Sequence, residues 1–244
     1  MEIGNYYAGY RQINNLFNDF ADARIYRRRG PATDADEKKF GLDDNAFRVI
    51  TRDAGGQILN SVLIGKAAAD NLYHFARIEG EKDVFLITGN FSFPKTAVSW
   101  LQQPLLSLSP ADIRSLKIGQ ETAVRSDIIV PFKIKGKQAV PDISRYLNAL
   151  GFVAAYDVRR SADFDRLQFS APKSLTVTTF DGLVVTIEVY GRTGEEYWAS
   201  LKFSTTTLPT TAVNDYIKSS AFLYEDWYFR LAPDVGRILF NAFI

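Results

Sequence analysis

Residues 177–189 read VTTFDGLVVTIEV, and residues 49–64 read VITRDAGGQILNSVLI. Each stretch holds two runs of aliphatic and β-branched residues separated by a turn signal, an Asp-Gly pair at 181–182 and a Gly-Gly pair at 55–56. Such a turn between two apolar runs predicts an antiparallel β-hairpin. The chain therefore makes the same kind of hairpin twice, and the elements around the two hairpins decide the fold.

These surrounding elements follow one order in both halves of the chain. A stretch with apolar residues at helical spacing (6–20, and again 140–150) precedes a strand-like stretch, a polar connector, the hairpin and a further strand. The matched positions are Ile13 with Ile143, Arg27-Arg28 with Arg159-Arg160, Asp53 with Asp181, and Tyr73 with Tyr197. Agreement in the order, type and approximate length of the elements indicates an internal repeat.

We expect an α+β protein of two related units, residues 1–108 and 109–244, each of amphipathic helices packed on a curled antiparallel sheet. Two copies are too few for a solenoid. Residues 111–137 alternate apolar and polar residues, which predicts two additional strands for the second unit. Residues 93–106, FPKTAVSWLQQPLL, are expected to be helical.

Composition excludes several classes of function. Lys plus Arg is 29 and Asp plus Glu is 28, so the chain has no overall field that would attract nucleic acid or an anionic membrane. The absence of cysteine excludes disulfides, thiolate nucleophiles and cysteine metal sites, and leaves the compartment open. Neither a signal peptide nor a membrane-spanning stretch is recognisable in the sequence.

Catalytic and cofactor motifs are also missing. The sequence contains no GxGxxG and no GxSxG, and the glycine-lysine pair at 65–66 lacks the rest of a phosphate-binding loop. The acids at 34–37 lack the glycine and the closing acid of a calcium loop. We therefore predict no metal, no cofactor and no enzymatic activity.

Four groups of residues remain as candidates for function. His74 is the single histidine, and the matched tyrosine in the second half is followed by Trp198 instead, so a catalytic role for His74 would belong to one copy only. Glu195 and Glu196 are the acids that an enzyme acting on an envelope polymer would use. A cleft between the two halves could be lined by Tyr73, His74, Tyr197, Trp198 and Trp227.

The fourth candidate is the basic run RIYRRRG, which carries Arg24, Arg27, Arg28 and Arg29. Such a run can bind a phosphate or an acidic partner. Charges along a strand are also the way in which an exposed sheet edge avoids unwanted pairing. Both readings make this run a candidate interaction surface.

A family resemblance rests on the order of several short motifs. They are FGLDDNAFRVI (40–50), LIGK (63–66), DVFLITG (83–89), WLQQPLLSLSPADI (100–113), TFDGLVVTIEV (179–189), EEYWASLKF (195–203) and EDWYFRLAPDVGRIL (225–239). In this order the motifs resemble domain-of-unknown-function family 4340. The chain departs from the family pattern at Pro233-Asp234, where members often carry a tyrosine-lysine pair.

The resemblance implies a bacterial protein that is anchored by one N-terminal membrane helix and occurs beside ABC transporters of the gliding-motility type. It implies no activity, cofactor or catalytic residue. The membrane helix is missing here, so we expect this chain to be a soluble portion that lies at the periplasmic face of the inner membrane in the full-length protein, touching the membrane only through the missing anchor.

The expected function is that of a non-enzymatic extracytoplasmic interaction module, an accessory of an ABC-type transport system whose partners are transporter subunits or other envelope proteins. Two alternatives stay open, an envelope glycan or small-ligand binder and an enzyme acting on an envelope polymer. The oligomeric state, the partner's identity and the transported substrate do not follow from the sequence.

Overall fold

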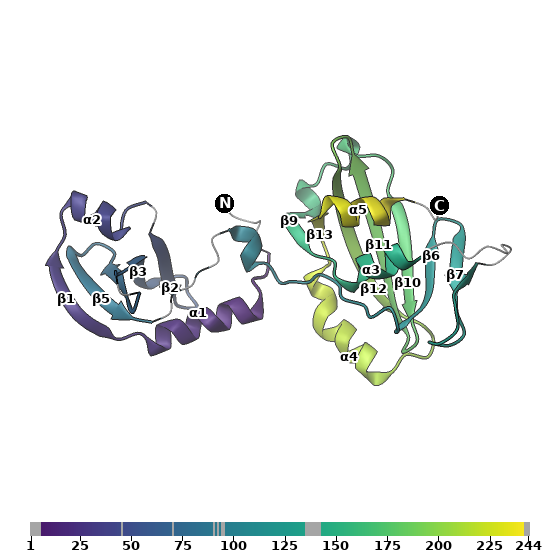
Figure 1. Cartoon of the computed structure of the whole chain (residues 1–244), viewed down its shortest axis with the longest axis horizontal. Coiled ribbons are helices and arrows are strands. Elements are labelled where there is room, and N and C mark those ends of the chain that lie inside the picture. The colour runs from purple at the N-terminus through teal and green to yellow at the C-terminus, as the bar shows by residue number, and fades with distance from the viewer. Residues whose placement is uncertain are drawn as a thin grey trace. The chain divides into compact units, whose positions relative to one another are not determined.

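A computed structural model of the chain describes residues 6–241, except residues 45, 70, 90, 92, 94–95 and 135–142. The chain divides into two compact units, residues 10–95 and residues 1–9 together with 96–244. We call them the five-stranded unit and the eight-stranded unit, after the sheets in their described parts (Figure 1).

The sheet of the five-stranded unit has the order β1-β5-β4-β3-β2, and every neighbouring pair is antiparallel. Strand β1 therefore lies at one edge, as the charged run predicted. The elements of this unit are α1 (Tyr10–Asp22), β1 (Ile25–Pro31), α2 (Asp34–Phe40), β2 (Phe47–Arg52), β3 (Ile58–Ala67), β4 (Tyr73–Ile78) and β5 (Asp83–Thr88).

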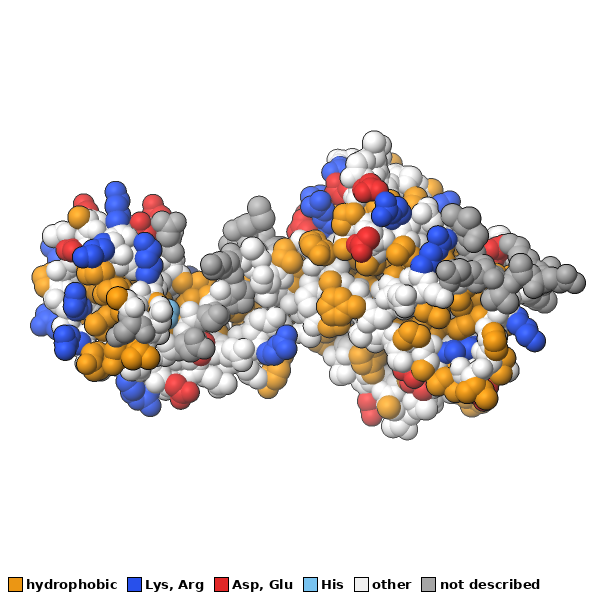
Figure 2. Space-filling view, in the orientation of Figure 1, with side chains coloured by type: hydrophobic (Ala, Val, Ile, Leu, Met, Phe, Trp, Pro, Cys, Tyr) orange, Lys and Arg blue, Asp and Glu red, His pale blue; other side chains and the backbone are white. Residues whose placement is uncertain are grey.

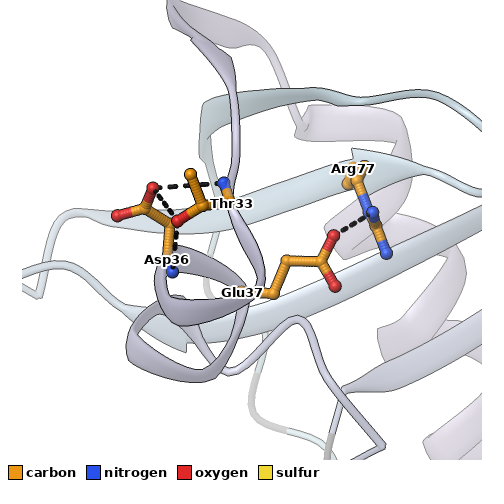
Figure 3. A network of polar contacts seen from close by, with 4 residues as sticks. All are labelled: Thr33, Asp36, Glu37 and Arg77. Carbon is orange, nitrogen blue, oxygen red and sulfur yellow. Dashed lines mark hydrogen bonds and ion pairs between the residues drawn. The ribbon is translucent and has the colours of Figure 1, made fainter.

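Polar contacts cap the start of helix α2 and join the helix to this sheet (Figure 3). The Thr33 hydroxyl accepts a hydrogen bond from the backbone N–H of Asp36, and the Asp36 carboxylate accepts one from the Thr33 N–H at 3.2 Å. This reciprocal cap satisfies two free donors at the start of the helix. Glu37, one residue further on, accepts a hydrogen bond from the Arg77 guanidinium on β4.

Two small cores cover the two faces of this sheet, because alternate residues of each strand point to opposite sides. On one face Leu63 and Val84 pack with Phe40 of α2. On the other face Ile64 and Ala76 pack with Phe91, whose ring lies 5.5 Å from that of Phe20 in α1.

The sheet of the eight-stranded unit has the order β8-β7-β6-β10-β11-β12-β13-β9, again antiparallel at each pair. Helices α3 and α5 cover one face and build a single large core with it (Figure 1). The elements are η1 (Ala97–Trp100), β6 (Ile113–Ile118), β7 (Glu121–Val124), β8 (Lys133–Ile134), α3 (Ser144–Gly151), β9 (Ala155–Arg160), η2 (Ser161–Asp163), η3 (Arg166–Gln168), β10 (Lys173–Thr179), β11 (Leu183–Arg192), β12 (Glu196–Thr205), α4 (Thr211–Ser220), η4 (Ala221–Leu223), β13 (Trp227–Leu231) and α5 (Pro233–Phe240).

The strand order repeats between the two units. The order β9-β13-β12-β11-β10 matches β1-β5-β4-β3-β2 position by position, with a helix before the first strand in both. The expected α+β fold with antiparallel sheets is confirmed. Strands β6, β7 and β8 extend the second sheet beyond β10, where the intervening sequence predicted additional strands.

Two details differ from the sequence-based expectation. The compact units divide at 95/96, whereas the sequence placed the boundary at 108/109, because Leu101, Leu105 and Leu106 pack into the core of the eight-stranded unit. The helix predicted over residues 93–106 is wrong: within its described part only η1 is helical. Pro104 cannot continue a helix, and Leu105 donates its backbone N–H to the Val153 carbonyl instead.

Candidate functional site

A split between strands β12 and β13 marks the eight-stranded unit. All of β12, from Glu196 to Thr205, pairs with β11, but β13 pairs with β12 only at Trp198↔Arg230 and Ala199↔Phe229. Residues 206–226, which carry α4 and η4, separate the two strands. A cavity of about 760 Å³ opens at this split, within the size range of small-molecule sites.

The floor of the cavity is apolar. Leu201 is 2% exposed and Trp227 is 7% exposed, and both belong to the main core. The ring of Phe203 lies 4.6 Å from that of Tyr224. The Tyr224 hydroxyl donates a hydrogen bond to the Leu105 carbonyl at 2.7 Å, so this ring is held in place.

The wall on the outer side of the sheet is polar. Glu188 on β11 lies opposite Ser200 on β12, and the Ser200 hydroxyl is 3.5 Å from a Glu188 carboxylate oxygen. Burial raises the pKa of Tyr190 to about 12, and a hydrogen bond with Tyr228 adds to the rise. Tyr190 is therefore a neutral hydroxyl at physiological pH. Lys202 completes this wall and is exposed.

The rim carries further charges. Ser161 donates its backbone N–H to the Asp226 carbonyl at 2.8 Å, and Asp226 adopts a left-handed φ of 62°. The Arg166 guanidinium lies 5.4 Å from the centroid of the Tyr228 ring, a cation–π contact. With Glu225, the cavity lining presents both carboxylates and cations around an apolar floor, an arrangement that suits binding of a ligand with apolar and charged groups.

The predicted arginine surface lies on β1 and the residue before it, and its four members differ in their contacts. Arg24 donates to the Ala21 and Ala23 carbonyls at the end of α1, and Arg28 donates to Asp83 at 2.7 Å. Arg27 lies 5.6 Å from the centroid of the Tyr26 ring. Among the described residues no ion pair involves Arg27 or Arg29, and both are exposed at the sheet edge. Figure 2 shows several Lys and Arg side chains over the surface of the five-stranded unit.

The residues predicted to line a cleft between the halves divide between the two units. In the five-stranded unit Tyr73 stacks on Tyr26 with ring centroids 4.2 Å apart. His74 is half-buried, with Nδ1 3.4 Å from the Gly65 carbonyl oxygen and its ring against Phe91. Both side chains thus pack inside their own unit.

In the eight-stranded unit the three aromatic residues lie on two faces of one sheet. Trp198 is fully buried with Tyr190, Tyr228 and Phe164 on the outer face. Tyr197 and Trp227 belong to the opposite, helix-covered face. The alternation of a strand separates these neighbours, so Trp198 cannot share a surface with Tyr197.

The two candidate acids are both engaged. Glu195 pairs with Arg237 at 2.9 Å. Glu196 accepts hydrogen bonds from the Trp198 indole N–H at 2.7 Å and from Arg192 at 2.6 Å. Burial tends to raise the pKa of Glu196, but these hydrogen bonds outweigh it, and the pKa lies below its ordinary value. A general acid requires the opposite shift.

Sequence reasoning did not identify the cavity. Its lining comes from residues on β11, β12, η4 and β13 that are far apart in the sequence. One signal was readable: the repeat aligns β4 with β12 and β5 with β13, yet only residues 79–82 connect the first pair, whereas residues 206–226 connect the second. An insertion between paired strands indicates a place where the sheet is interrupted.

The described part of the chain contains no group of three His, Asp or Glu residues arranged to hold a metal ion. It also contains no helix that is long and apolar enough to span a bilayer.

The geometry defines a class of protein built from a duplicated helix-and-antiparallel-sheet unit. The family model described as "Domain of unknown function (DUF4340)" matches residues 4–172, more than half of the chain, and the chain belongs to this family. The three motifs after residue 172 that also resemble the family lie beyond the matched range. Searches of curated proteins and of solved structures found no match.

Proposed function

We propose that this chain is a non-enzymatic interaction module that acts outside the cytoplasm as an accessory of an ABC-type transport system. The observation that carries the proposal is the repeated edge. Each unit ends its sheet with a strand that carries arginines, β1 with Arg27 and Arg29 and β9 with Arg159 and Arg160. Exposed arginines can bind the carboxylates of an acidic partner through charge-assisted hydrogen bonds.

The two edges differ in how the arginines are held. Arg159 lies over the Trp198 ring at 4.7 Å and Arg160 over the Trp227 ring at 5.2 Å, so aromatic contacts fix both guanidinium groups. Arg27 and Arg29 on β1 are less restrained and are the better candidates for contacting an acidic partner. The family resemblance supports partners among transporter subunits or other envelope proteins at the periplasmic face of the inner membrane.

Charge reversal on β1 tests this proposal. The variant Arg27→Glu with Arg29→Glu leaves the Arg28–Asp83 pair intact, and Arg114→Glu with Lys117→Glu, exposed on β6, is the matched control. We expect the β1 variant to lose cross-linking to transporter subunits in bacterial membranes and to fail to complement a deletion strain, while the control retains both. Full complementation by a folded β1 variant would remove the basis for the proposal.

The same strain separates this function from an enzyme acting on an envelope polymer. The triple variant His74→Ala, Glu195→Gln, Glu196→Gln removes the candidate catalytic groups while keeping the arginine edges. We expect it to complement the deletion when it is present at normal levels. Failure of a folded, normally abundant triple variant would favour the enzyme.

A small-ligand or glycan binder is the second candidate, favoured by the cavity at the β12–β13 split. Sugar rings are usually held by stacking on exposed aromatic faces. Four of the five aromatic residues in the cavity lining, Tyr190, Tyr224, Trp227 and Tyr228, are each at most 7% exposed. This burial weakens the glycan reading and leaves the cavity open to another kind of ligand.

A further inference from the structure

The cavity lies beside the first part of an open strand edge, residues 200–203 of β12. In an antiparallel pair, every second residue directs its peptide N–H and C=O away from the partner strand. Over residues 200–205, β12 pairs with β11 on one side, and no backbone partner occurs on the other side among the described residues. Main-chain donors and acceptors of this edge are therefore available over about 20 Å of strand.

The five-stranded unit shows what occupies this position when the sheet is complete. There β4 pairs with β5 continuously, from Tyr73↔Thr88 to Arg77↔Val84. In the eight-stranded unit the pairing of β12 with β13 stops at Ala199, and residues 200–205 have no such partner on the β13 side among the described residues. The element that fills this position in the repeat is a β-strand.

The side chains around the edge define the chemistry of an incoming strand. Leu201 and Phe203 point to the apolar floor, whereas Ser200 and Lys202 point to the outer wall with Glu188. Glu225 and Asp226 add two carboxylates at the rim, so the lining holds three acids against two cations, Arg166 and Lys202. A strand with alternating residues would place apolar side chains on the floor and basic side chains against these acids.

We propose that the open edge of β12 over residues 200–205 receives an extended peptide segment, paired as an added strand, whose apolar residues enter the cavity and whose basic residues face Glu188, Glu225 and Asp226. The proposal deepens the interaction function proposed above by stating the chemistry of the partner segment. It rests on that function only in assigning the peptide to a partner protein.

The test uses the purified full chain and a synthetic heptapeptide, acetyl-Thr-Val-Lys-Leu-Lys-Val-Thr-amide. Its control is the same peptide with alternate backbone nitrogens methylated, which removes hydrogen-bond donors from one strand edge. We expect saturable binding of the first peptide, roughly tenfold weaker binding of the control, and slowed amide hydrogen exchange at alternate residues of 200–205. Equal affinity of the two peptides, no binding, or no protection in 200–205 would each overturn the proposal.

Matched variants locate the site. Ala221→Trp places a large side chain at the cavity wall, and Ala212→Trp on α4 lies outside it. We expect the first to abolish peptide binding and the second to preserve it. If Ala221→Trp does not fold, Glu188→Gln provides the milder test, with affinity about two- to fivefold weaker, against unchanged affinity for Glu195→Gln.

The outcomes are separable from the proposed function. Peptide binding is measured on the purified chain, whereas the β1 charge reversal is measured in membranes. If the peptide binds and the β1 charge-reversal variant still complements the deletion, the peptide site on β12 stands and the partner contact proposed for β1 is wrong. Protection of the cavity by a small polar solute, without the alternating pattern, would identify a small-ligand site and overturn the strand proposal.

Discussion

The hairpin β4–β5 and the split pair β12–β13 occupy the same place in the two repeats, and they differ in one respect. A connection of residues 79–82 holds β4 and β5 together along five residue pairs. Residues 206–226 connect β12 and β13, which share only two pairs. The difference shows how a duplicated fold acquires a site: an insertion between two paired strands opens a cavity without changing the strand order.

The largest expected effect tests two positions that the sequence repeat matches. Trp198 is fully buried, donates its indole N–H to Glu196 and lies under Arg159, beside Phe164 of the β9–β10 connection. His74 is half-buried against Phe91 on the face that α1 covers, so the structure places the two side chains in different surroundings. We expect Trp198→Ala to lower the free energy of unfolding by about 3–5 kcal/mol and His74→Ala by about 1 kcal/mol.

Urea unfolding monitored by site-resolved hydrogen exchange measures both losses of unfolding free energy. This readout reports each unit separately, which matters because the two units need not unfold together. Similar losses for the two variants would contradict the view that the buried cluster of Phe164, Tyr190, Trp198 and Tyr228 is a core feature of the eight-stranded unit alone.

The second effect tests the two hairpin turns. Gly182 has φ of 98° and a Cβ there would lie 2.7 Å from the Pro209 backbone, whereas Gly56 has φ of 84° and open space around it. We expect Gly56→Ala to cost about 1 kcal/mol from backbone strain and Gly182→Ala about 2–4 kcal/mol, because steric conflict adds to strain.

Thermal unfolding of the two variants measures the two losses of stability. The Tm of each variant is compared with that of its own unit in the parent protein. Equal decreases in Tm would mean that residues 206–210 move away from the new Cβ, so that no steric conflict remains at the turn.

The smallest effect concerns pH. Hydrogen bonds from Thr33 lower the pKa of Asp36, and those from Trp198 and Arg192 hold the pKa of Glu196 below its ordinary value in spite of burial. A carboxyl whose folded pKa is depressed stabilises the fold above its unfolded pKa, and this contribution is lost as the pH falls through the folded value.

We therefore expect the eight-stranded unit to lose stability below about pH 4.5, the ordinary value for Glu196, and the Glu196→Gln variant to lose less. Asp36→Asn should reduce the corresponding acid loss in the five-stranded unit, starting below about pH 3.8. The measurement is the urea midpoint of each unit as a function of pH, from about pH 6 to pH 3. If the midpoint of a variant falls with pH as steeply as that of the parent protein, the prediction is contradicted.

Local patterns were enough to predict much of the fold. The turn residues at 55–56 and 181–182 and the apolar runs beside them predicted both central hairpins, and the matched order predicted the repeat. The basic run at 24–29 predicted an edge strand. These features depend on neighbours within a few residues, and for that reason a single sequence reports them.

The site depended on contacts between distant residues. The sequence determined the strands, the hairpins, the charged edge and their duplication, because alternation and turn chemistry are local properties. Only the tertiary structure decided that 96–108 joins the second unit and that β12 separates from β13. The first outcome depends on the packing of Leu101, Leu105 and Leu106 in the core, and the second on how residues 206–226 pack on the sheet. Packing energy is shared among residues that the sequence order does not bring together.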